Sequence, residues 1–204
     1  MTHTVGILLF EKVEVLDFAG PFEVFSTATR VKSRLEPDTP KPFEVVTIAE
    51  ELRPIKARGG LLVQPGFDFT DHPAIDILIV PGGDVSSELK RAQVTDWIVR
   101  TAPGTCVTAS VCTGAFLLGK AGLLNGKPAT THWEDVGDLQ AMFPQVQVET
   151  SSRWIDAGQV ITSAGISAGI DMSLHIVRRI EGKELAIRTA RQMEYEWHLA
   201  DFDE

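Results

Sequence analysis

The sequence predicts an α/β fold, a three-layer sandwich in which helices cover both faces of a mainly parallel sheet. Short apolar segments alternate with longer amphipathic ones along the chain. Three of the short segments, Thr4–Phe10, Ile75–Val80 and Thr105–Val111, are apolar almost throughout, which is typical of strands buried on both faces. Alternation of such strands with helices favours a parallel sheet between helical layers.

The pattern places each element. The expected strands are Thr4–Phe10, Phe43–Ile48, Ile75–Val80, Thr105–Val111 and Gln159–Ser163. The expected helices are residues 20–30, 84–101, 113–122, 133–142, 167–181 and 183–197. We also expect a hairpin around Val146–Gly158 with its turn at residues 156–158. Asp84 is expected to cap the helix that follows it, and Gly182 to end the helix that precedes it.

The length and the net charge of the chain exclude several classes of protein. A chain of 204 residues is long enough to bury a sizeable core, and we expect one domain over residues 1–204. With 19 basic and 28 acidic residues the net charge is −9, which argues against a nucleic-acid partner. No apolar segment approaches the roughly 20 residues of a membrane helix. The first ten residues lack a signal peptide, so we expect a cytoplasmic protein with no membrane contact.

Cys106 and Cys112 are the two cysteines of the chain. No Cys/His group has the spacing of a zinc site, so we expect neither a metal nor another cofactor. If the segment between the cysteines is extended, their Cα atoms are roughly 20 Å apart, too far for a disulfide. Cys106 lies within the expected strand and is interpreted as a buried structural residue.

Cys112 stands where a buried strand meets a helix, in the segment Thr105–Gly119. Parallel sheets bind their ligands at this carboxyl end of the strands. A helix N-terminus next to the sulfur would lower the pKa of the thiol and favour the thiolate. The alternative is a buried structural cysteine, the commonest role of a free cysteine.

A second turn, Pro81-Gly82-Gly83-Asp84, ends another buried strand and should open at the same edge of the sheet. There the backbone N–H groups near Gly82, Gly83 and Thr113 are candidates to stabilise a developing negative charge. The alternative is a glycine-rich turn that merely leads into a capped helix.

Asp17 is flanked by bulky apolar residues, an unusual place for a solvated carboxylate. Burial would raise the pKa of this carboxyl group and let it donate a proton near neutral pH. The alternative is a helix cap. Because Pro21 suits the first turn of a helix, however, the cap is expected nearer Gly20.

His132 could act as a base or thiolate partner, or simply be a histidine satisfied at a strand end. His175 is interpreted as packed or surface-exposed, and Asp171 as either a supporting carboxylate or a first-turn acid. The apolar spacing of the last expected helix indicates packing against the core or against a second subunit.

Residues 5–180 resemble the DJ-1/PfpI (ThiJ) superfamily. The motifs are LDFAGPFEVF, ILIVPGG, SVCTGAFLLGKAGLLNGKPATTHW and ITSAGISAGIDMSLHIV. The third motif places the chain near the branch of isonitrile hydratases and of the amidase-like sensor domains of AraC-type regulators. The resemblance implies a flavodoxin-like sandwich, similar to class I glutamine amidotransferases, and a homodimer without metal or cofactor.

The resemblance also assigns roles. Cys112 matches the family nucleophile, Asp17 its acidic partner and Thr113 the residue that supplies oxyanion-type contacts. His132 falls where several relatives carry a histidine near the cysteine. Protease-like relatives have histidine after the nucleophile, so Thr113 argues against peptidase activity. No basic recognition helix precedes Glu204, so DNA binding is not expected.

The leading hypothesis is an isonitrile hydratase-like enzyme that converts a small-molecule isonitrile to an N-substituted formamide, with Cys112 attacking and Asp17 as the acid and base. One alternative is a glyoxalase-like thiol enzyme that acts on small aldehydes and uses His132. The other is a non-enzymatic sensor of a small molecule or an oxidant, in which Cys112 is oxidised.

Overall fold

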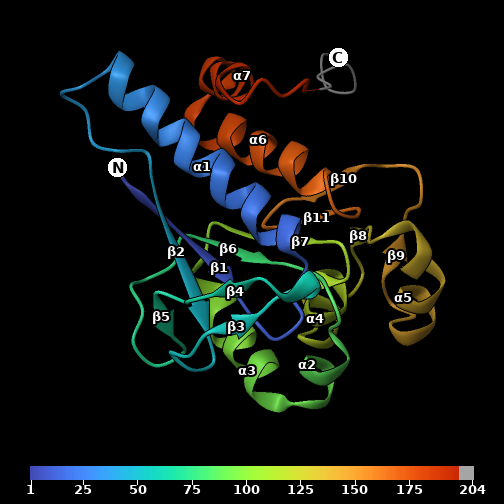
Figure 1. The fold of residues 1–204 in the computed structure, drawn as a ribbon. Coiled ribbons are helices and arrows are strands. Elements are labelled where there is room, and N and C mark those ends of the chain that lie inside the picture. Colours follow the sequence, from blue (N-terminus) through green and yellow to red (C-terminus); the bar gives the residue numbers. More distant parts are fainter. Residues whose placement is uncertain (198–204) are drawn as a thin grey trace.

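The computed structural model describes residues 1–197. Within this part of the chain, a central sheet has the strand order β10-β11-β7-β6-β1-β2-β5 (Figure 1). Its neighbouring strands are parallel apart from the β10–β11 pair, which confirms the mainly parallel sheet. The strands are β1 (His3–Leu8), β2 (Phe43–Ala49), β5 (Phe67–Asp68), β6 (Ile77–Val80), β7 (Val107–Val111), β10 (Trp154–Ala157) and β11 (Val160–Ser163).

Helices cover both faces of this sheet, which confirms the three-layer sandwich. Figure 1 shows one helical layer above the sheet and another below it. The first layer contains α1 (Val15–Leu35), α6 (Ala168–Glu181) and α7 (Lys183–Gln192). The second contains α2 (Ser86–Lys90), α3 (Ala92–Thr101) and α4 (Gly114–Lys120). Every residue of β6 and β7 is buried, as their apolar sequences predict.

Smaller elements lie around these layers. Two short pairs of strands are β3 (Ile55–Lys56) with β4 (Leu62–Val63) and β8 (Pro128–Ala129) with β9 (Gln147–Val148). Helix α5 (Val136–Met142) follows the 3₁₀ turn Trp133–Asp135, and further 3₁₀ turns occupy Arg58–Gly60 and Ala102–Gly104. Among residues 1–197, no helix is both long and apolar enough to cross a membrane.

The first helix differs from its prediction. It begins at Val15 rather than near residue 20, so Pro21 lies inside the helix and not in its first turn. Proline has no N–H to donate to the carbonyl of residue i−4, which is Asp17. The helix therefore tolerates Pro21 at the cost of one backbone hydrogen bond. Asp17 lies in the first turn and is fully buried, and the residue at the N-cap is Glu14.

Other boundaries also shift. The expected helix 84–101 is divided at Arg91, whose backbone is extended between α2 and α3. Asp84 Oδ1 accepts a hydrogen bond from the N–H of Ser86, although it is not the N-cap residue. The hairpin turns at Gly158 as expected, but it joins β10 to β11, whereas β9 pairs with β8. The final helix ends at Gln192, short of the expected residue 197.

Cys106 is exposed and precedes β7, so its interpretation as a buried structural cysteine is wrong. Its Sγ lies 3.1 Å from the backbone oxygen of Asp76. The apolar residues around Cys106 in the sequence belong to the strand, whereas Cys106 itself belongs to the turn that leads into it.

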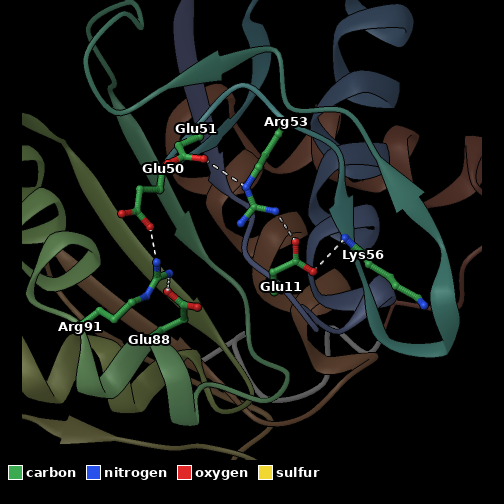
Figure 2. A network of polar contacts seen from close by, with 7 residues as sticks. All are labelled: Glu11, Glu50, Glu51, Arg53, Lys56, Glu88 and Arg91. Atoms are coloured by element: carbon green, nitrogen blue, oxygen red, sulfur yellow. Dashed lines mark hydrogen bonds and ion pairs between the residues drawn. The ribbon is translucent and has the colours of Figure 1, made fainter.

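Charged side chains and the backbone N–H of Lys56 connect several loops in one network (Figure 2). The members of this network are Glu11, Glu50, Glu51, Arg53, Lys56, Glu88 and Arg91. Arg53 bonds Glu11, which follows β1, at 2.8 Å, and Arg91 bonds the buried Glu88 of α2. The exposed pairs add little stability, but burial of Glu88 makes its pairing with Arg91 necessary. The network links the β1–α1 connection to β3.

Candidate active site

Three neighbouring strands end at one edge of the sheet and supply the candidate residues. Strand β1 leads to Asp17 in α1, β6 leads to Gly82 and Gly83, and β7 leads directly to Cys112. Since β7, β6 and β1 are adjacent and parallel, their carboxyl ends meet at the same place. This is the edge at which open α/β sheets bind ligands.

Cys112 occupies a sharp turn between β7 and α4. Its φ of 55° lies in the left-handed region, which is uncommon for a residue other than glycine and costs of order 1–3 kcal/mol. The turn is also tight on the helix side. A Cβ on Gly114 would lie 2.1 Å from the backbone oxygen of Val80, so only glycine lets α4 begin this close to β6.

Contacts on both sides hold the Cys112 backbone in this conformation. Its N–H donates to the carbonyl oxygens of Ser163 and Ala164 at 3.1 and 3.3 Å, at the end of β11. The hydroxyl of Thr131 donates to its carbonyl oxygen at 2.9 Å. Strain of this kind persists only where surrounding contacts fix it, and it is common at functional sites.

Asp17 is completely buried beside this turn. Its Oδ2 accepts a hydrogen bond from the Gly82 N–H at 3.0 Å, while its Oδ1 is buried without a hydrogen-bond partner. Burial raises the pKa of this carboxyl group from 3.8 to about 7, although the Gly82 N–H opposes the shift. Asp17 can therefore gain or lose a proton near neutral pH, as its apolar sequence context predicts.

The thiol of Cys112 contradicts the expected thiolate. Burial and, to a smaller extent, the negative charge of Asp17 raise its pKa to about 12. The backbone N–H of Thr113 favours the thiolate, but it does not outweigh these effects. A helix N-terminus is favourable to an anion, yet the desolvated sulfur beside a carboxylate keeps its proton. Cys112 is thus a thiol at neutral pH.

The glycine turn packs directly against Thr113. Gly83 donates its N–H to Thr113 Oγ1 at 2.9 Å, and the same hydroxyl donates to the Gly83 carbonyl oxygen at 2.9 Å. A Cβ on Gly82 would lie 2.6 Å from the Thr113 nitrogen and 2.9 Å from Asp17 Oδ2. The N–H groups of Gly82 and Gly83 thus have partners, so an oxyanion contact from Gly83 requires release of the Thr113 hydroxyl.

His132 lies at the same cavity, at the start of a 3₁₀ turn. Its Nδ1 accepts a hydrogen bond from the Glu134 N–H at 3.4 Å and lies 3.4 Å from Asp135 Oδ2. Its ring passes so close to Gly165 that a Cβ there would lie 2.1 Å from the histidine Cδ2.

These residues line one cavity of about 220 Å³. Gly83, Cys112, Thr113 and His132 are among its lining residues, whereas Asp17 lies buried behind them. The lining also includes residues that sequence analysis did not single out, namely Glu14, Arg58, Glu134, Asp135 and Ile166. A pocket below the roughly 300 Å³ typical of drug-sized ligands suits a small reacting group.

Glu14 and Arg58 form an ion pair at this cavity, with 3.1 Å between Arg58 Nη1 and Glu14 Oε2. The charge of Glu14 raises the pKa of Asp17, and the charge of Arg58 lowers it. Glu14 could have been found in the sequence, since it lies three residues before Asp17. Arg58 could not, because it comes from the turn between β3 and β4, which local sequence does not connect to the site.

Two other candidates lie elsewhere. His175 Nε2 is 2.7 Å from Asp156 Oδ2, and its ring stacks on Trp154 at 3.9 Å between centroids. Asp171 binds Arg153 and accepts from the Tyr195 hydroxyl at 3.1 Å. None of these residues lines the cavity at Cys112.

Comparison with known proteins decides the family. A profile of the DJ-1/PfpI family matches residues 3–179. The chain belongs to the DJ-1/PfpI family. Isonitrile hydratase of Pseudomonas putida is 34% identical over 196 residues, which cover 96% of this chain and 79% of that protein.

Other DJ-1/PfpI relatives are regulators. The HTH-type transcriptional regulator GbdR of Pseudomonas aeruginosa is 30% identical over 195 residues, which cover 95% of this chain. The match covers 51% of GbdR, so this chain spans about half the length of that regulator. The family therefore contains both an enzyme and regulators at comparable similarity to this chain.

Solved structures agree with the DJ-1/PfpI fold. A ThiJ/PfpI family protein from Pseudomonas syringae has a TM-score of 0.84 at 25% identity, covering 99% of this chain and 78% of that chain. DJ-1beta of Drosophila melanogaster has a TM-score of 0.81 at 18% identity, covering 97% of this chain and 100% of that chain. At 18% identity, the similarity to DJ-1beta concerns the fold alone.

Proposed function

We propose that the protein is a cysteine-dependent, isonitrile hydratase-like enzyme that converts R–N≡C and water to an N-substituted formamide. The observation that carries this proposal is the pair formed by Cys112 and Asp17. A thiol on a strained turn lies beside a buried carboxyl group whose pKa is about 7. The similarity to the isonitrile hydratase of Pseudomonas putida supports the same chemistry.

When Asp17 is ionised, Cys112 and Asp17 together hold one proton, which is bound to the sulfur of Cys112. In the first step the thiol proton passes to Asp17 as the sulfur attacks the terminal carbon of the isonitrile. Asp17 then delivers that proton to the same carbon, which gives the thioimidate S–CH=N–R. General acid–base transfer of this kind typically contributes 10²–10⁴-fold to the rate.

Water completes the reaction. Asp17, again anionic, takes a proton from a water molecule that attacks the thioimidate carbon and passes this proton to the nitrogen, which gives S–CH(OH)–NH–R. Collapse of this adduct breaks the carbon–sulfur bond, releases the formamide and returns the hydroxyl proton to the sulfur through Asp17. The N–H of Thr113, which already favours negative charge on the sulfur, stabilises charge during these steps.

Asp17 suits this role better than His132. Nδ1 of His132 already lies against the Glu134 N–H and the Asp135 carboxylate, each at 3.4 Å. Asp17 Oδ1, by contrast, is buried without a partner. We therefore assign the proton transfers to Asp17 and a lining role to His132. This assignment disfavours the glyoxalase-like alternative, in which His132 is active.

A second candidate is a small-molecule-sensing domain, favoured by the 30% identity to GbdR. In that case the cavity would bind its ligand without turnover. Oxidant sensing fits less well, since oxidation follows thiolate character and the pKa of Cys112 is raised to about 12. A homodimer also remains a prediction, which light scattering in solution tests.

The experiment is formamide production from a simple alkyl isonitrile by wild type, Cys112→Ala and Asp17→Asn. The proposal expects turnover by wild type and its loss in both variants. Binding of the isonitrile without formamide would support the sensing alternative instead. The Cys106→Ala variant is the matched control, because Cys106 is exposed and lies outside the residues that line the cavity.

A further inference from the structure

A groove adjoins the cavity at Cys112. It lies between α2, α4 and α5 and has a volume of about 530 Å³. Groove and cavity share Gly83, Thr113 and Asp135 in their linings, so the two spaces meet at these residues. The cavity alone fits a small reacting group, whereas the groove is within the size range of sites for larger organic ligands.

The groove has an apolar floor. Leu89 of α2, Phe116 of α4 and Met142 of α5 all line it. Phe116 is buried and held edge-on against Phe143, with 6.4 Å between ring centroids. Met142 is 52% exposed, and methionine adapts readily to apolar ligands of different shape. An apolar group in this groove would cover surface that is exposed to water in the unliganded protein.

Charges along the groove are of one sign. Its described lining contains the carboxylates of Asp84, Asp135 and Asp138 and no lysine or arginine. Lys12 pairs with Asp84 at 2.9 Å, Lys120 donates to the carbonyl oxygen of Leu89, and Asp135 lies near His132. Even with these basic neighbours, an anionic ligand would meet three carboxylates and two lysine ammonium groups. The groove therefore selects against negative charge.

We propose that this groove binds the nitrogen substituent of the substrate, and that this substituent is an extended apolar group without negative charge. The inference rests on the proposed hydratase reaction, which places the isonitrile carbon at Cys112. Because C≡N–R is linear, the substituent projects straight away from the attacked carbon. Thr113 and Gly83 border both spaces, so a substituent that leaves the cavity past them enters the groove.

Ethyl, butyl and hexyl isonitriles test the apolar part of the proposal. Each added CH₂ that enters the groove should raise kcat/KM about two- to fourfold. A hexyl chain ending in a carboxylate should be a poorer substrate than one ending in an amide or an ammonium group. Met142→Asp should flatten the dependence on chain length, whereas Leu35→Asp should preserve it. Leu35 is the matched control because it is 51% exposed and lies at the far end of α1.

Alkylation of Cys112 separates this inference from the proposed function. Iodoacetamides with the same ethyl, butyl and hexyl groups on nitrogen react with the thiol without any hydration chemistry. Intact mass gives their rates on Cys112 in the Cys106→Ala protein, because Cys106 is exposed and would react as well. Faster alkylation by the longer reagents, lost in Met142→Asp, would support the groove even if no formamide forms. Formamide production with no dependence on chain length in either assay would overturn the groove and leave the hydratase proposal standing.

Discussion

Asp17 and Cys112 each change the proton affinity of the other. The charge of Asp17 adds to the burial that raises the pKa of the Cys112 thiol to about 12. Contact with the thiol lowers the pKa of Asp17, but burial dominates and brings it to about 7. The two groups together therefore lose one proton near pH 7 and retain the other well above it. A neutral thiol that gives its proton to a buried carboxylate follows from this arrangement.

The pH dependence of activity should report the Asp17 titration. Below pH 7 both groups are protonated and the thiol has no base to receive its proton, so kcat/KM should be low. It should rise through about pH 7 to a plateau, because kcat/KM reports the free enzyme. Rates measured from pH 5 to 9 check this expectation. A profile that falls as pH rises through 7 would instead require a protonated Asp17 at the start of the reaction.

Removing the charge of Glu14 or of Arg58, the ion pair at the cavity, should shift the pKa of Asp17 in opposite directions. Glu14 raises the pKa of Asp17 and Arg58 lowers it. Glu14→Gln should therefore move the rise in kcat/KM to lower pH, and Arg58→Gln should move it to higher pH. The same pH series on both variants measures the two shifts. Shifts of the same sign would mean that these charges do not act on the titrating group directly.

Asp17→Asn should stabilise the protein at neutral pH while it removes activity. The folded protein holds the Asp17 proton up to about pH 7, and an unfolded carboxyl group only to 3.8. The folded state thus binds more protons in this window, so wild-type stability decreases as pH rises through it. Asparagine does not ionise, so between pH 5 and pH 8 the unfolding free energy of wild type should fall by about 2–3 kcal/mol relative to that of the variant. Urea unfolding at pH 5 and pH 8 measures the change.

Gly82→Ala should disrupt the site for steric reasons. The added Cβ would lie 2.6 Å from the Thr113 backbone nitrogen, and neither partner can move without shifting the turn at Cys112. We expect a loss of about 1–3 kcal/mol of stability, together with the loss of activity. Gly137→Ala is the control, because nothing lies within 4 Å of its Cβ position in α5. There alanine should stabilise the helix by roughly 0.5–1 kcal/mol. Equal effects of the two substitutions in thermal unfolding would contradict this account.

Thr113→Val tests the hydroxyl that links the two turns. The substitution keeps the shape but removes the partner of the Gly83 N–H and carbonyl. A partly buried hydrogen bond of this type contributes about 1 kcal/mol, so a modest loss of stability is expected. If the freed Gly83 N–H binds negative charge during the reaction, kcat should be retained within about tenfold. A much larger loss of kcat would assign the Thr113 hydroxyl itself to the reaction.

The sequence was sufficient to predict the sheet, its parallel strands and the meeting of Gly82, Gly83 and Cys112 at one edge. Each of these follows from a local pattern, namely apolar segments and the turns that end them, whereas the partnership of Asp17 with Cys112 was implied by the family resemblance. The pKa of Cys112 was not predictable, because it depends on burial and on Asp17, which is 95 positions away in the chain. Arg58 was missed for the same reason, since only the tertiary structure brings its turn to the cavity. The start of α1 was misplaced because Pro21 normally marks the first helical turn.

The covalent intermediate is the most direct test of the central claim. Wild-type protein is mixed with an alkyl isonitrile, quenched within milliseconds and measured by intact mass, with formamide followed in parallel. Our account predicts a mass increase equal to one isonitrile, located on Cys112 by peptide mapping, and absent from Cys112→Ala, which makes no formamide. Formamide production by Cys112→Ala at the wild-type rate would contradict it.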